Sequence, residues 1–153
     1  MNKGFTLVEI MISTVILGAL GVGFYGVWQT GRSSYFTDNN LLGLQQQARN
    51  GLDRMARELR QASASSVVVT IINSTNYRVT FNTPIASGVQ YYLNGTQLVR
   101  QYPGGTVKTI ASDINYLKFT LNSTTLSIEI NAGKTYFKST SFSLIERIQL
   151  RNA

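Results

Sequence analysis

Hydrophobic and polar residues divide the chain into three segments with different periodicities. The first is an almost unbroken apolar run from Phe5 to Trp28, in which Glu9 is the only charged residue. At a rise of about 1.5 Å per residue, a helix of this length spans about 36 Å, enough to cross a hydrocarbon core of about 30 Å. The pattern therefore predicts a transmembrane helix over residues 5–28 with one carboxylate at membrane depth.

The second segment, residues 39–62, has the three- and four-residue spacing of an amphipathic helix. Its apolar stripe consists of Leu41, Leu44, Ala48, Leu52, Met55, Leu59 and Ala62. On the polar face, Asp53–Arg57 and Arg54–Glu58 have the spacing of ion pairs along a helix. Two alternatives stay open at its start: Thr37, Asp38 or Asn39 caps a new helix, or one helix continues through residues 5–62.

The third segment, residues 63–153, has the alternation and turn residues of β-structure. Val67–Ile72 is long enough for a buried strand, and Tyr77–Phe81 alternates. Asn94-Gly95 predicts a type I′ hairpin turn between residues 90–93 and 96–100. Strands are also expected at 115–121 and 126–130, joined by a turn at 122–125.

The C-terminal segment Phe142–Leu150 is ambiguous, because Glu146 shares the parity of its apolar neighbours while Ile145 does not. A β-bulge near these two residues restores the register, and a short helical turn is the alternative. We expect the bulged strand. Six or seven antiparallel strands then need a cover for their apolar face, and the stripe of the second segment supplies it. The predicted fold class is α+β, a long N-terminal helix packed on a C-terminal antiparallel sheet.

Composition removes several classes of chemistry. The 153 residues carry a net charge of +7 and contain no Cys and no His, so Cys/His metal sites and His-dependent nucleophilic catalysis are excluded. The carboxylates of residues 63–153 are widely separated, and no calcium loop or cofactor motif is present. Three Asn-x-Ser/Thr sequences, which start at Asn73, Asn94 and Asn122, are interpreted as turns. Acidic residues interrupt the arginines between 49 and 60, which disfavours nucleic-acid binding and favours a solvated helix face.

Lys3-Gly4-Phe5-Thr6-Leu7-Val8-Glu9 resembles the cleavage and methylation segment of type IV prepilins and type II secretion pseudopilins. The resemblance implies that residues 1–4, with the charged Lys3, form a leader. It implies that a prepilin peptidase cuts after Gly4 and methylates the new N-terminal residue, Phe5. The mature chain would be a single-pass protein of the bacterial inner membrane, with its N-terminus cytoplasmic before processing and residues 63–153, the head, exported. It would later enter a pilus or pseudopilus.

The resemblance also implies a role for Glu9. In a filament, the α-amino group of Phe5 in one subunit is a cation that can lie at membrane depth beside the carboxylate of a neighbour. Gly18, Gly21, Gly23, Gly26 and Gly31 soften the same helix. They allow close packing between helices, or they let the segment bend or melt when a subunit leaves the bilayer. The implied partners are other minor and major pilins or pseudopilins, the inner-membrane assembly platform and membrane lipid.

Three looser motifs are similar to PilW-type minor pilins and the minor pseudopilin J: the helix passage Leu52–Gln61, the hairpin Tyr92–Arg100 and the ending Leu150–Asn152. The interpretation is a minor pilin of a type IV pilus and not an enzyme. A minor pseudopilin of a type II secretion system is the alternative. An anchored adhesin or DNA-binding pilin is a second alternative, supported only by the basic surplus of the head.

Overall fold

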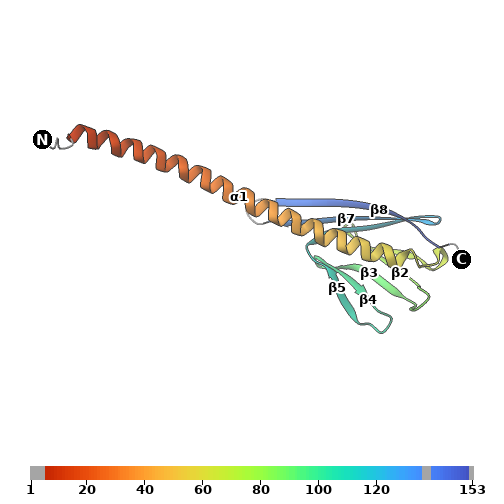
Figure 1. The fold of residues 1–153 in the computed structure, drawn as a ribbon. Coiled ribbons are helices and arrows are strands. Elements are labelled where there is room, and N and C mark those ends of the chain that lie inside the picture. The colour runs from red at the N-terminus through yellow and green to blue at the C-terminus, as the bar shows by residue number, and fades with distance from the viewer. Residues whose placement is uncertain (1–5, 136–138, 152–153) are drawn as a thin grey trace. The chain divides into compact units, whose positions relative to one another are not determined.

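The computed structural model describes residues 6–135 and 139–151 (Figure 1). The chain forms two compact units, residues 1–38 and residues 39–153. One helix, α1 (Leu7–Leu59), contributes to both units. The helix has no break near residues 37–39, so the alternative of a capped restart is wrong. The helix is continuous there but ends at Leu59, three residues before the predicted end at Ala62.

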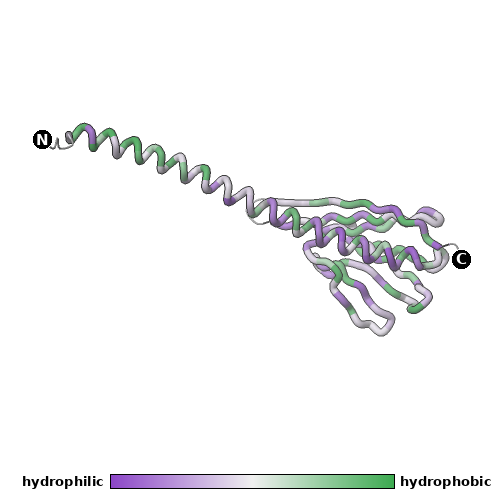
Figure 2. Tube along the Cα trace, viewed as in Figure 1, coloured by the Kyte–Doolittle hydropathy of each residue, from purple (hydrophilic) through white to green (hydrophobic). Residues whose placement is uncertain are grey.

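In the first unit, every described side chain from Thr6 to Asp38 is solvent-exposed. Most of these side chains are apolar, as the green N-terminal part of the tube in Figure 2 shows. The helix also runs unbroken through the five glycines between residues 18 and 31, and an added Cβ at any of them would contact nothing within 4 Å. By length and composition this part of α1 could cross a membrane.

In the second unit, α1 supplies one side of a hydrophobic core. The predicted stripe is confirmed: Leu41 is half-buried, and Leu44, Ala48, Leu52, Met55, Leu59 and Ala62 are buried. Two further residues of α1, Gly51 and Ala56, are buried as well. Gly51 permits a close approach to the sheet, because a Cβ there would lie 2.8 Å from Leu98 Cδ2 and 3.2 Å from Ala111 Cβ.

The chain leaves α1 through a short 3₁₀ turn, η1 (Ala64–Ser66), and then forms an eight-stranded sheet. The strands are β1 (Val68–Asn73), β2 (Asn76–Phe81), β3 (Val89–Asn94), β4 (Gln97–Gln101), β5 (Val107–Ala111), β6 (Ile114–Asn122), β7 (Thr125–Thr135) and β8 (Ser139–Gln149). Their order is β5-β4-β3-β2-β6-β7-β8, with β1 beside β2. All neighbours pair antiparallel except β2 and β6, which meet in parallel at Asn76 and Leu117.

Short hairpins connect most of the strands, and the three Asn-x-Ser/Thr sequences lie at them as predicted. The β3–β4 hairpin is confirmed, but its two-residue loop is residues 95–96, one residue later than predicted, and the turn type differs. Asn94 pairs with Gln97, and Gly95 is the loop residue with a positive φ of 61°. A positive φ at the first of two loop residues is typical of a type II′ turn rather than type I′. The prediction also missed β5, a short strand in which residues 107–109 are exposed.

The first strand differs from its prediction. β1 is a strand that pairs with β2 alone. Val67 just before it is buried and Val69 packs against the core, but Val68, Ile71 and Ile72 are 57%, 66% and 44% exposed. A run of β-branched residues therefore indicated a strand here but wrongly indicated burial. Burial depends on which strands and helices cover a segment, and the segment's own composition does not record that.

The last strand is also partly as expected. β8 is a strand, but it pairs with β7 without interruption from Thr125–Gln149 to Thr135–Ser139, so the predicted bulge is wrong. Glu146 keeps its place on the inner face between Leu144 and Ile148 because Arg60 at the end of α1 donates to its carboxylate at 2.9 Å. Ile145 points to the other face and is 63% exposed. An ion pair, rather than a register shift, accommodates the irregular pattern.

The architecture is therefore α+β and pilin-like, with a long N-terminal helix whose second part covers a mostly antiparallel sheet. This confirms the predicted fold class. Charged residues occur in an otherwise apolar setting at two places. One is the exposed start of α1, and the other is the buried interface between α1 and the sheet in the second unit. These are the candidates for function.

Candidate assembly site

The start of α1 is organised by Thr6. Its carbonyl oxygen accepts hydrogen bonds from the amides of Glu9 and Ile10 at 3.1 and 3.2 Å, and its Oγ1 accepts from the Glu9 amide at 3.3 Å. Thr6 therefore has the position of an N-cap, with Glu9 three residues further along. This spacing places the Glu9 carboxylate in the first turn, where the positive end of the helix dipole favours a negative charge.

Glu9 has no cation partner among the described residues, and its surroundings are apolar and uncovered. Leu7, Val8, Ile10 and Met11 are between 55% and 76% exposed. No further charged residue follows along α1 until Arg32. Such a carboxylate is stable in water, but in a bilayer or a bundle of helices it needs a counter-ion from another molecule.

The predicted cleavage residues Lys3, Gly4 and Phe5 lie outside the described residues. Processing after Gly4 and methylation of Phe5 therefore remain predictions from the sequence. Within the described residues, the observation that bears on assembly is the capped helix start and the unpartnered carboxylate of Glu9.

The interface between α1 and the sheet contains an ion pair that sequence reasoning missed. Arg100 of β4 donates from Nε to the Glu58 carboxylate at 2.8 Å, and its side chain is only 10% exposed. The guanidinium also lies 3.9 Å from the centroid of the Tyr102 ring. Burial lowers the pKa of Arg100, but the hydrogen bond and the charge of Glu58 outweigh it, and the pKa is raised overall.

Tyr91 of β3 lies beside this pair and is fully buried. Its hydroxyl has no hydrogen-bond partner among the described residues. Burial, and then the neighbouring charge of Glu58, raise the pKa of Tyr91 far above its usual range. The cluster thus contains a fixed ion pair and a phenol held neutral. Its arrangement connects α1 to the sheet.

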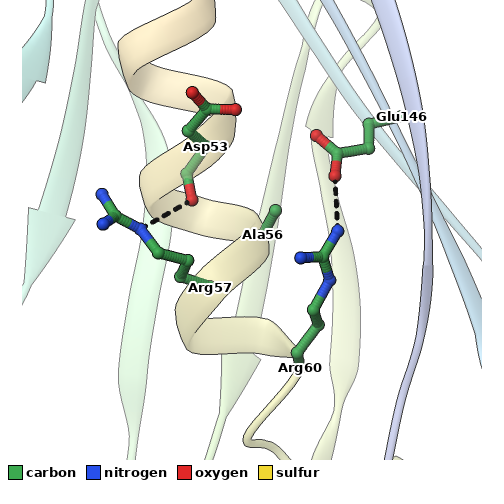
Figure 3. A pocket seen from close by; sticks show the side chains of 5 residues that line it. All are labelled: Asp53, Ala56, Arg57, Arg60 and Glu146. Atoms are coloured by element: carbon green, nitrogen blue, oxygen red, sulfur yellow. Dashed lines mark hydrogen bonds and ion pairs between the residues drawn. The ribbon is translucent and has the colours of Figure 1, made fainter.

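A second ion pair lies at the surface, in a shallow groove of about 330 Å³ between α1 and β8 (Figure 3). Arg60 donates to Glu146, while Arg57 Nε donates to the backbone carbonyl oxygen of Asp53 at 3.3 Å. Neither predicted pair along the helix is formed among the described residues: Glu58 binds Arg100 instead of Arg54, and Arg57 binds the carbonyl of Asp53 instead of its carboxylate. Glu58 and Arg60 therefore pair with residues of the sheet rather than with neighbours along the helix.

The remaining described carboxylates do not gather into a site. Asp113 pairs with Lys134 at 3.4 Å. Within the part of the chain that the structure describes, no three His, Cys, Asp or Glu side chains lie together as metal ligands would.

Comparison with known families gives one match, at the N-terminal segment. A family model for the prokaryotic N-terminal methylation motif matches residues 1–25, the segment that contains the helix start and Glu9. No curated protein matches the chain, and no solved structure matches it either.

The matched motif and the fold together support the prepilin and pseudopilin class, whose members are structural filament subunits rather than enzymes. Proteins with this motif are processed by a prepilin peptidase and assemble with other pilins. The long apolar start of α1 fits a membrane-anchored member of the class.

Proposed function

We propose that this protein is a minor pilin-like subunit of a type IV pilus, with a structural and not a catalytic role. The prepilin peptidase removes residues 1–4 and methylates Phe5. The subunit is then stored as a single-pass protein of the inner membrane, with its head exported, until it enters or primes a filament. The lone carboxylate of Glu9, one turn into an uncovered apolar helix, is the observation that carries this proposal.

The chemistry of Glu9 supports a partner in another subunit. Its counter-ion must be a cation that reaches the same depth, and α1 offers none of its own before Arg32. Cleavage after Gly4 creates such a cation, the methylated amine of Phe5. Pairing that amine with the Glu9 carboxylate of a neighbour removes two unpaired charges from an apolar bundle, which favours docking and defines the axial register.

The inner-membrane orientation is part of the proposal. Lys3 and the initiator amine lie on the N-terminal side of the apolar segment, which favours retention of that end in the cytoplasm. The polar second unit then lies on the far side. A minor pseudopilin of a type II secretion system would share the leader, the anchor and the Glu9 pair. Identification of the subunits crosslinked to Glu9-proximal residues separates these two systems.

Mass spectrometry of the N-terminus tests the processing step. The mature protein is expected to begin with N-methylated Phe5, and Gly4→Leu is expected to accumulate as an uncleaved precursor in the membrane. A wild-type mature protein that retains Met1 would exclude the prepilin assignment.

Substitution of Glu9 by Gln tests the assembly step. Gln keeps the shape but removes the charge, so insertion and cleavage should continue while incorporation into filaments falls about tenfold or more, as expected when an ion pair in an apolar setting is lost. Glu9→Asp is the matched control, because it retains the charge and should recover part of the incorporation. If Glu9→Gln is cleaved and incorporated as efficiently as the wild type, the charge pair does not recruit this subunit.

A further inference from the structure

The first unit contains a second charged feature, at the other end of the apolar segment. Arg32 is the next charged residue after Glu9. At about 1.5 Å per residue, the two lie about 35 Å apart along the helix axis. This separation is close to the thickness of a hydrocarbon core with a margin for the headgroup region. Whichever border of a bilayer Glu9 is near, Arg32 falls near the opposite one.

Arg32 is held between two aromatic rings. Its guanidinium carbon lies 5.5 Å from the centroid of the Trp28 ring and 5.7 Å from the centroid of the Phe36 ring, one turn before and one turn after it. Both distances are within the range of cation–π attraction. The stack holds the guanidinium along the helix surface and leaves N–H donors available, because no carboxylate among the described residues pairs with Arg32.

Two tyrosines extend the same surface. The Tyr25 and Trp28 rings lie 6.3 Å apart, and the Tyr35 and Phe36 rings lie 6.0 Å apart. At 100° per residue, all of these side chains lie on one face of α1. A shallow surface groove on the same part of the helix is lined by other residues, namely Gly26, Gln29, Thr30, Ser33 and Ser34. The aromatic residues are therefore gathered on one side of the helix, over three turns that span about 16 Å.

The combination of amphipathic rings and arginine is suited to a lipid interface. Tyr and Trp prefer the headgroup level, because one end of the ring is apolar and the other forms hydrogen bonds. The planar guanidinium of Arg binds phosphate through two parallel hydrogen bonds. In water these rings would remain largely exposed, because the side chains of Tyr25, Trp28 and Tyr35 are each at least 60% exposed. A phospholipid headgroup layer satisfies both the rings and the cation.

We propose that Tyr25, Trp28, Arg32, Tyr35 and Phe36 form an interfacial belt that lies among the phospholipid headgroups of the leaflet farther from the N-terminus. Arg32 binds headgroup phosphate, and the rings set the depth at which the stored subunit waits in the membrane. The belt rests on the proposed membrane-stored state but does not depend on cleavage or filament entry. It extends the anchor beyond Trp28, where the uninterrupted apolar run ends.

Trp28 is the only tryptophan of the chain, so its fluorescence in the full-length protein reports on the belt directly. The protein is reconstituted into phosphatidylcholine vesicles in which bromine, a quencher, is placed either near the headgroup end or near the methyl end of the acyl chains. Bromine near the headgroup end should quench Trp28 more strongly. Stronger quenching by bromine near the methyl end, or no quenching by either in vesicle-bound protein, would overturn the belt.

A second measurement tests the role of Arg32. Vesicles of phosphatidylcholine with a minor fraction of brominated phosphatidylglycerol report how many anionic lipids surround Trp28. Low salt should show a local enrichment of about fivefold over the bulk fraction, which corresponds to one cation at an anionic surface. Arg32→Gln should bring the enrichment close to the bulk value, while the exposed Arg49→Gln, on the same helix, should leave it unchanged.

The two proposals can fail separately. Flotation of the protein with vesicles reports anchoring, which the proposed function needs. Absence of flotation would contradict the stored membrane state itself. Flotation with an unchanged enrichment in Arg32→Gln would instead exclude phosphate binding by Arg32 and leave the proposed function in place. Arg32→Lys should retain most of the enrichment, because the positive charge remains at the same level.

Discussion

The two parts of α1 have the same secondary structure but opposite relations to their surroundings. From Thr6 to Asp38, all described side chains are exposed although most are apolar. From Leu44 to Leu59, the apolar side chains are buried against the sheet, and Glu58 and Arg60 pair with residues of β4 and β8. The sheet of the same chain covers the apolar side chains of the second part. The apolar side chains of the first part can be buried only by lipid or by neighbouring subunits.

This difference assigns folding stability to the second unit, and membrane and filament contacts to the first unit. Apolar burial at about 25 cal/mol per Å² stabilises the second unit within the chain itself. The first unit gains nothing comparable until it enters a bilayer or a bundle of helices. Substitutions in the second unit should therefore change its free energy of unfolding, and substitutions at Glu9 or Arg32 should change membrane and filament behaviour without changing that free energy.

Truncation of α1 should have the largest effect on the second unit. A chain that begins at Tyr35 retains the apolar stripe over the sheet and should be monomeric, soluble and β-rich. A chain that begins at Ser63 lacks the stripe and should aggregate, because the inner face of the sheet is then exposed to water. Circular dichroism and NMR dispersion check both. A well-dispersed spectrum from the chain that begins at Ser63 would contradict the importance of the helix–sheet contact.

Loss of the buried ion pair should have the next largest effect. Glu58→Gln leaves the Arg100 guanidinium without a counter-ion, and the free energy of unfolding should fall by about 2–4 kcal/mol. The value is below that of a fully enclosed pair because the Glu58 side chain is 24% exposed. Glu146→Gln is the matched control. Its partner Arg60 is 56% exposed, so the cost should stay below about 1 kcal/mol. Urea denaturation of the chain that begins at Tyr35 measures both, and equal costs would contradict this ranking.

Two glycines of α1 differ in how closely the sheet approaches them, and substitutions there should have smaller effects. Gly51→Leu places a side chain where Leu98 and Ala111 already lie, and should lower the free energy of unfolding by about 1–3 kcal/mol. Gly43→Leu introduces the same change on the same helix at a site with nothing within 4 Å, and should stabilise it by about 0.5–1 kcal/mol through helix propensity. The same denaturation experiment applies, and effects of the same sign at both sites would show that close approach at Gly51 is unimportant.

Tyr91 provides the smallest predicted effect and a pH dependence. Tyr91→Phe removes a buried hydroxyl without a partner and should raise the free energy of unfolding by about 1 kcal/mol at neutral pH. The pKa of Tyr91 is raised in the folded state. Its unfolded-state pKa is about 10, so the protonated form is favoured by folding. The stability this contributes is complete below about pH 10 and is lost as the pH rises above it.

Comparison of the two proteins between neutral pH and about pH 11 tests this linkage. The wild-type protein should lose more stability over this range than Tyr91→Phe. Parallel curves for the two proteins would show that another group controls the alkaline transition.

The local pattern was sufficient for features that depend on neighbours along the chain. A carboxylate in an apolar run is visible in the sequence, so the sequence alone is enough to propose a role for Glu9. The three- and four-residue spacing predicts the stripe of α1, which the structure confirms. Turns at Asn73, Asn94 and Asn122 were found because their residue types have intrinsic turn preferences. The N-terminal motif was found for the same reason, since all of its residues lie within one short segment.

Tertiary structure alone decided the features that depend on distant residues. Glu58 and Arg100 are 42 positions apart, and Arg60 and Glu146 are 86 apart, so the helix-surface pairs expected from spacing were replaced by pairs with the sheet. Glu146 could stay on the inner face of an unbulged strand only because Arg60 reaches it. The exposure of β1 likewise follows from its place beside β2 alone. Periodicity predicts on which face of an element a side chain lies. Which segment buries that face, and which residue pairs with a charge, depend on segments that meet only after folding.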